Sequence, residues 1–201
     1  AVTIRGAGME VTKAYDIVSE PTVVGGNFSI KIPAEDTGRL TLEGIFHNEN
    51  IWFSEGQVKN ALFLKSRFKN ISRPGSCKVQ DLTVLNCRIA DNISVGSGNS
   101  AQFLNSVVRD FSDGYMSFSH CVILNSFSVR NEGNEYKSCI ICHDDNTYDN
   151  MVSSSSSAYN NLFVSNRSDK LNNVPNQTNL RVPKSDERFA YLIGYNDSKD
   201  Y

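Results

Sequence analysis

The stretch Leu82-Thr-Val-Leu-Asn-Cys-Arg-Ile89 carries the pattern that decides the fold. Leu82 and Val84 are apolar and two positions apart, which is the spacing of side chains on one face of a β-strand. Asn86 follows at a point where the chain can bend, because asparagine tolerates the left-handed backbone conformation that most L-residues resist. Ile89 is again apolar after the bend. The stretch therefore predicts two short strands that meet at a corner, each with one face buried.

Copies of this stretch recur about every 20 residues, as in solenoid proteins. The copies are residues 39–46, 61–68, 101–108, 121–128 and 139–146, with a weaker copy at 158–163. Stacking the copies places these residues at the corner: Glu43, Lys65, Asn86, Asn105, Asn125, His143 and Asn160. It predicts these inward-facing residues: Ala61, Leu82, Ala101, Cys121 and Cys139 in one column, Phe63, Val84, Phe103, Ile123 and Ile141 in a second, and Phe68, Ile89 and Val108 in a third. Aligned corner asparagines are expected to form a hydrogen-bonded ladder from coil to coil.

Composition agrees with an all-β chain and excludes several classes of function. The 201 residues include 22 Asn and 25 Ser, which favour turns and caps over helix interiors and so argue against a helical bundle. The 20 basic and 22 acidic side chains nearly balance, so we expect neither a nucleic-acid partner nor an anionic membrane surface. No apolar run is long enough to span a bilayer. The five cysteines show no zinc-site pattern and are expected in the core.

The repeat resembles the right-handed single-stranded parallel β-helix of the pectate-lyase-like superfamily. The resemblance covers residues 39–163, and the opening Val2-Thr-Ile-Arg-Gly-Ala-Gly8 also looks like the first coil of such proteins. It implies an all-β solenoid of about seven coils, similar to secreted bacterial β-helix proteins. A leucine-rich repeat is the structural alternative. Residues 79–89 fit its template, but the other copies lack the second apolar segment that this fold needs.

We expect one β-helix domain over residues 1–201, in three parts. Residues 1–38 form an N-terminal coil and turn region, 39–165 the regular coils, and 166–201 a C-terminal tail that is a candidate cap. The chain begins at Ala1 without an initiator methionine, so we expect it to be part of a longer chain. Open coil ends would present unpaired strand edges, so we expect that the protein can self-associate through these ends.

The richest polar cluster is His143-Asp-Asp-Asn-Thr-Tyr-Asp149. His143, Asp144 and Asp145 are candidate catalytic residues, because paired carboxylates can act on a glycosidic bond. Asp144, Asp145 and Asp149 are candidate ligands of calcium, the one cofactor that this chemistry suggests. The alternative is a solvated turn in which the Asp and Asn side chains bind backbone groups.

Outward positions on the middle coils supply the candidate ligand-binding residues Arg88, Asp91, Arg109, Asp110 and Trp52. Arg67, Arg88 and Arg109 are expected on neighbouring coils, where they can form either surface ion pairs or a polar platform for a sugar. An aromatic face with a polar edge can stack on a sugar ring. Candidates for such stacking are Trp52, Tyr115, Tyr136, Tyr148 and Tyr159.

The motifs of polygalacturonase-like hydrolases, pectate lyases and pectin methylesterases are missing from the sequence, and this favours a protein that is not an enzyme. We therefore expect a non-catalytic, secreted or cell-surface module that associates with a polysaccharide or mediates adhesion. One alternative is a polysaccharide lyase or glycoside hydrolase acting on an acidic glycan. A second alternative is the structural shaft of a fibre or adhesin.

Overall fold

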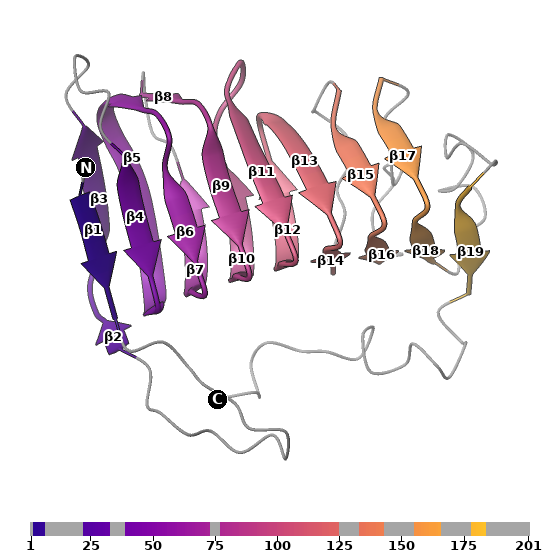
Figure 1. Ribbon diagram of the computed structural model, residues 1–201, viewed down its shortest axis with the longest axis horizontal. Coiled ribbons are helices and arrows are strands. Elements are labelled where there is room, and N and C mark those ends of the chain that lie inside the picture. The colour runs from indigo at the N-terminus through magenta and orange to yellow at the C-terminus, as the bar shows by residue number, and fades with distance from the viewer. Residues whose placement is uncertain are drawn as a thin grey trace.

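The computed structural model describes residues 2–6, 22–32, 39–72, 77–124, 133–142, 155–165 and 178–183. Within these ranges the only regular elements are β-strands, which wind into a parallel β-solenoid of about six turns (Figure 1). Each regular coil contributes one strand to each of two sheets, and every strand pair is parallel. This arrangement confirms the predicted fold class. It excludes a leucine-rich repeat, in which the second segment of each repeat would be a helix or a 3₁₀ turn.

Sheet 1 has eight strands, which follow one another along the solenoid axis in chain order. They are β1 (Val2–Arg5), β4 (Leu40–Glu43), β6 (Leu62–Leu64), β9 (Leu82–Leu85), β11 (Ser100–Leu104), β13 (Tyr115–Ser119), β15 (Glu135–Lys137) and β17 (Ser157–Tyr159). Strand β1 confirms that the opening residues form the first strand of the stack.

Sheet 2 has eleven strands and lies behind sheet 1 in Figure 1. Its main path is β2 (Thr22–Val24), β5 (Ile45–Val58), β7 (Arg67–Ser72), β10 (Arg88–Ser94), β12 (Val107–Ser112), β14 (Val122–Ile123), β16 (Ile140–Cys142), β18 (Leu162–Val164) and β19 (Leu180–Val182). Two further strands, β3 (Phe28–Ile32) and β8 (Lys78–Val79), pair with the long strand β5.

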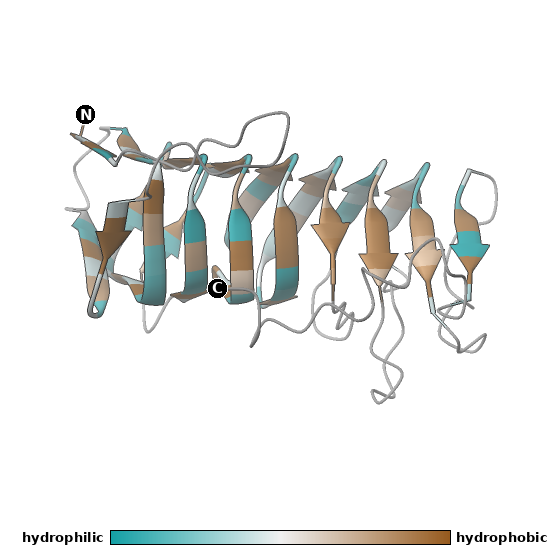
Figure 2. Cartoon of the chain, turned by 90° about the horizontal axis from the view of Figure 1, so that it is seen from below, coloured by the Kyte–Doolittle hydropathy of each residue, from teal (hydrophilic) through white to brown (hydrophobic). Residues whose placement is uncertain are grey.

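The core runs through the middle of the solenoid between the inward faces of the two sheets. Val84 and Phe103 are fully buried, as their column predicts, and apolar bands recur from strand to strand (Figure 2). Phe118 stacks on Phe103 with 4.8 Å between ring centroids and on Tyr136 with 5.5 Å. Because equivalent rings meet in successive coils, each coil buries its apolar face against its neighbours, as expected for a solenoid.

At the corner between sheet 1 and sheet 2, one residue of each coil has a positive φ. These residues are Gly44, Lys65, Asn86, Asn105, His120, Ser138 and Asn160. The predicted left-handed bend is therefore confirmed at Lys65, Asn86, Asn105 and Asn160. Three predictions of register are wrong: the coil of β4 and β5 bends at Gly44 instead of Glu43, the coil after Asn105 bends at His120 instead of Asn125, and the next coil bends at Ser138 instead of His143.

The second error displaces the columns that follow it. Ile123 and Ile141 pair in line with Val108 in sheet 2, so they belong to the third column. Their predicted place beside Phe103 is taken by Phe118 and, one coil further, by Tyr136.

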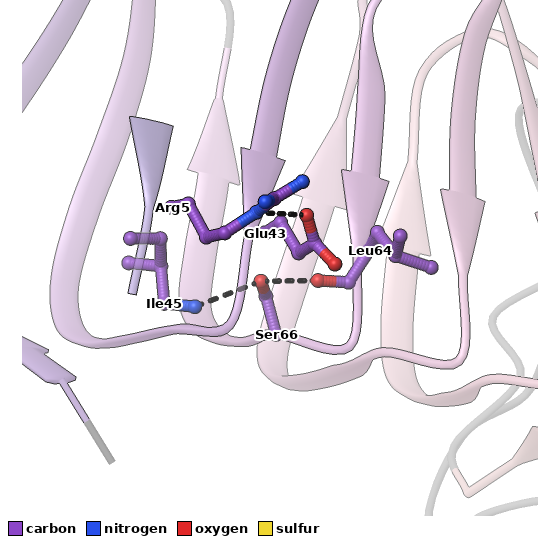
Figure 3. A network of polar contacts seen from close by, with 5 residues as sticks. All are labelled: Arg5, Glu43, Ile45, Leu64 and Ser66. Carbon is purple, nitrogen blue, oxygen red and sulfur yellow. Dashed lines mark hydrogen bonds and ion pairs between the residues drawn. The ribbon is translucent and has the colours of Figure 1, made fainter. Parts of the chain in front are cut away.

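A ladder of side-chain hydrogen bonds runs along the corner, one residue later than the expected asparagine ladder. The backbone N–H of each ladder residue donates to the side chain of the equivalent residue on the next coil. Ser66 begins this ladder: its Oγ accepts from the N–H of Ile45 at 3.1 Å and donates to the carbonyl of Leu64 at 2.8 Å (Figure 3). The later members are Cys87, Ser106, Cys121, Cys139, Asn161 and Asn179.

The ladder explains where three of the five cysteines lie. All five are buried and free of disulfides, as the prediction of core cysteines requires. Cys87, Cys121 and Cys139 accept backbone hydrogen bonds through Sγ or donate to carbonyl groups of their own corner. Burial raises the pKa of the Cys87 thiol to about 12, so this group stays protonated and serves structure.

Candidate functional site

The outer face of sheet 1 is hollowed by a cavity of about 300 Å³. The strands β9, β11, β13 and β15 and the residues just before them form its walls. Its lining includes polar residues from consecutive coils: Asp81, Thr83, Ser100, Gln102, Ser117 and Glu135. The cavity is also lined by Tyr115, Gly133 and the apolar residues Leu82, Ala101 and Met116, and we call it the sheet 1 groove.

Strand register places the floor of the groove. Thr83, Gln102, Ser117 and Glu135 are successive register partners on β9, β11, β13 and β15. Side chains alternate between the two faces of a strand, and their inward neighbours fill the core, so these four point outward. Neighbouring strands lie about 4.8 Å apart, and the four side chains therefore form a polar row along the solenoid axis.

Tyr115 supplies an aromatic wall beside this row. It is the first residue of β13 and pairs with Ser100 on β11. Its side chain is 46% exposed, although it contacts the next coil: a Cβ placed on Gly133 would lie 3.5 Å from Tyr115 Cε1. The ring is thus supported on one flank and open to solvent elsewhere, as a stacking platform for a ligand must be.

Two carboxylates give the groove its charge. Ser117 Oγ donates a 3.2 Å hydrogen bond to Glu135 Oε2 and so restrains this carboxylate at the floor. Asp81 lies at the rim, just before β9, in a left-handed turn with φ of 55°. Among the described residues that line the groove, none is a lysine or an arginine.

The ligand-binding residues proposed from the sequence lie on sheet 2, away from this groove. Arg88 pairs with Arg67 on β7 and with Val107 on β12, so Arg109 is not in the same row. The Arg67 guanidinium lies over the Phe46 ring, 4.6 Å from its centroid. Arg67, Arg88 and Arg109 therefore lie on the neighbouring strands β7, β10 and β12, as predicted, and Arg67 and Arg88 are register partners.

Asp91, Arg109 and Asp110 lie together farther along β10 and β12. The pKa of Asp110 is raised to about 7, mainly by burial and to a smaller extent by the nearby Asp91 carboxylate. The N–H of Phe111, which donates to Asp110 Oδ1 at 2.7 Å, and the charge of Arg109 act in the opposite direction. Trp52 is on the outward row of β5, 38% exposed between Ser29 and Ser72.

The predicted cluster His143, Asp144, Asp145 and Asp149 lies outside the described residues, and so does Tyr148. These catalytic and calcium-binding candidates remain predictions. Among the residues that the structure does describe, there is no group of three or more His, Cys, Asp or Glu side chains arranged for a metal ion.

The aromatic residues predicted to stack on a sugar differ in their exposure and in their distance from the groove. Tyr136 cannot stack on a ligand, because it is 1% exposed and its hydroxyl accepts a hydrogen bond from Asn134 inside the core. The prediction for Tyr136 is wrong because the register error placed this residue outside the inward column, whereas Tyr136 pairs with Phe118 in that column. Tyr159 is 51% exposed on β17 but does not line the groove. Among those of them that the structure describes, Tyr115 is the one that lines the groove.

Sequence reasoning missed Asp81, Gln102, Ser117 and Glu135 as site residues. A signal for one of them was present, because Gln102 sits at an outward position of a well-aligned copy. Ser117 and Glu135 follow the register error, which left them without a defined place on the outer face.

These features define the protein as a parallel β-solenoid with an aromatic, acidic groove on one outer sheet. Comparison with known protein families, with curated proteins and with solved structures found no match. A search of the described residues for a helix of sufficient length and apolarity to cross a membrane also found none.

Proposed function

We propose that this protein is a non-catalytic carbohydrate-binding module that holds a glycan chain along the sheet 1 groove. The observation that carries the proposal is the position of Tyr115 beside the polar row of Thr83, Gln102, Ser117 and Glu135. An exposed aromatic face stacks on the apolar face of a sugar ring, while neighbouring polar groups bind its hydroxyls.

The geometry of the row supports a chain-like ligand. The row repeats at the strand spacing of about 4.8 Å, which is comparable with the length of one sugar ring. Amide, hydroxyl and carboxylate groups lie on successive coils, so each coil can offer hydrogen bonds to a different sugar. The groove is open to solvent along the sheet, which suits a polymer better than an enclosed small molecule.

The sequence resemblance to the pectate-lyase-like superfamily of right-handed β-helices supports the same role. Proteins of this architecture place their binding surfaces on the outer faces of the coils. We extend the proposal to a secreted or cell-surface location, where polysaccharides are available as ligands.

The test is binding of a glycan panel by isothermal titration calorimetry, with two matched variants. Tyr115→Ala removes the platform, and we expect it to weaken binding at least about tenfold. Tyr159→Ala removes a similarly exposed tyrosine of the same sheet outside the groove, and should leave binding unchanged. A panel without any binding, or equal loss in both variants, would overturn the proposal.

A glycoside hydrolase is the second candidate, because the groove contains two carboxylates, Asp81 and Glu135. Glycosidases use two carboxylates about 5–10 Å apart as acid and as base or nucleophile, whereas Asp81 and Glu135 stand three strand spacings of about 4.8 Å apart, which favours binding over this reaction. If the wild type produces new reducing ends from a glycan and Glu135→Gln does not, the protein is a hydrolase and not a binding module. Unchanged glycans after long incubation would exclude it.

A further inference from the structure

The charge of the groove narrows the class of glycan, and this inference rests on the binding role proposed above. We propose that the sheet 1 groove selects amino-sugar polymers with free, protonated amines over neutral and acidic glycans. An ammonium group would bind at Glu135, on the floor, beside the Tyr115 ring.

The first support is the balance of charge. Asp81 and Glu135 both line the groove, and none of the other described lining residues is basic. In the described part of the chain, the ion pairs of the solenoid involve other carboxylates: Arg5 pairs with Glu43, and Lys31 with Glu55. Two carboxylates that form no ion pair with a described residue lie in one concave surface and give it a negative potential, which attracts cations and repels uronates.

The second support is the kind of groups that meet at the floor. Glu135 is held by the 3.2 Å hydrogen bond from Ser117, so its carboxylate is positioned before a ligand arrives. Tyr115 stands one strand away on β13, in the row next to Ser117. A fixed carboxylate and an aromatic face together recognise an ammonium group, through a charge-assisted hydrogen bond and a cation–π contact.

The third support is the chemistry of the other lining groups. Ser100, Gln102 and Thr83 can donate to and accept from sugar hydroxyls, and they carry no charge. These side chains can bind the hydroxyls of a sugar polymer equally well whether the polymer is cationic, neutral or acidic. Selection by charge is therefore expected to depend on the carboxylates, and above all on Glu135.

The experiment compares a β-1,4-linked glucosamine hexamer with its fully N-acetylated counterpart and with a galacturonate hexamer. The first two differ in charge and in the acetyl groups, and the third is acidic. At slightly acidic pH, we expect the glucosamine hexamer to bind at least about tenfold more tightly than the acetylated hexamer. The preference should shrink as added salt screens the charges.

Two variants locate the effect. Glu135→Gln keeps the shape of the side chain and should abolish the preference for the free amine while retaining weak binding. Glu49→Gln removes an exposed carboxylate on β5 of sheet 2 and should leave the preference intact. An equal loss in both variants would mean that net charge alone attracts the polymer, and would overturn the inference.

The outcomes separate this inference from the proposed function. The acetylated or the acidic hexamer could bind as tightly as the glucosamine hexamer, and Tyr115→Ala could abolish this binding. That result would retain the glycan-binding role and overturn the charge selection. No measurable binding of any hexamer would overturn both.

Discussion

The backbone N–H of Cys87 donates a 3.1 Å hydrogen bond to Oγ of Ser106 on the next coil. The same hydroxyl donates at 2.8 Å to the carbonyl of Leu104 in its own coil. Ser106 is 2% exposed, so water cannot replace either contact. The Ser106 side chain thus binds two backbone groups at a corner where the regular backbone hydrogen bonds of the sheets are interrupted.

Replacing Ser106 by alanine should destabilise the solenoid by about 1–3 kcal/mol, since the N–H of Cys87 would lose its acceptor inside the core. Urea denaturation followed by circular dichroism measures this change. Ser106→Cys is the matched control, because cysteine already accepts a backbone N–H at Cys87. We expect it to lose less than the alanine variant. Wild-type stability in Ser106→Ala would show that the ladder contributes nothing.

Asn105 tests the left-handed corner, where its φ is 47°. Asn105→Ala should cost about 1 kcal/mol, because alanine pays the steric penalty of this conformation without a compensating local hydrogen bond. Asn105→Gly should be neutral or slightly stabilising, since glycine has no Cβ. The difference between the two midpoints in urea is the measurement. The reverse order of stability would contradict the role assigned to this corner.

Phe118 tests the aromatic core, where it stacks between Phe103 and Tyr136. Phe118→Ala should cost about 3–5 kcal/mol, because it removes a fully buried ring and leaves a cavity. Phe118→Leu keeps much of the volume and should cost clearly less. Calorimetric melting temperatures rank the two variants. Similar melting temperatures for Phe118→Ala and the wild type would contradict the coil register described above.

Asp110 should make stability depend on pH. Its pKa rises from 3.8 to about 7 in the fold, so the folded protein binds more protons than the unfolded chain between these values. The free energy of unfolding should therefore fall as pH increases from about 4 to 7, and the contribution is complete below the unfolded pKa.

Melting temperatures across this pH range measure the dependence. Asp110→Asn cannot ionise, so it should remove this contribution and melt at a higher temperature than the wild type above pH 7. Because Asp110 is part of a half-exposed surface, we expect a shift of only a few degrees. An identical pH profile in both proteins would show that Asp110 ionises normally.

The alternation of apolar residues, and with it the fold class, could be predicted because both depend on local spacing. The residues 82–89 show inward-facing Leu82, Val84 and Ile89 around the left-handed Asn86 without any knowledge of other coils. These are properties of one strand and one bend, and neighbours in sequence specify them.

The register of the coils could be read only where their lengths are similar. Residues 121–125 look like a copy of the strand before the Asn105 corner, because both contain two inward apolar positions. Of these residues, Val122–Ile123 form β14 of sheet 2 instead, since the preceding coil is shorter and Tyr115–Ser119 already occupies the place in sheet 1. Only pairing with the adjacent coil distinguishes the two.

The sheet 1 groove depends wholly on that pairing. Asp81, Tyr115 and Glu135 are far apart in the chain, and nothing local to any of them indicates a binding site. They meet because successive coils stack in register and bring outward side chains to the strand spacing of about 4.8 Å. Local patterns thus specify the shape of each coil, whereas contacts between coils specify which side chains share a surface.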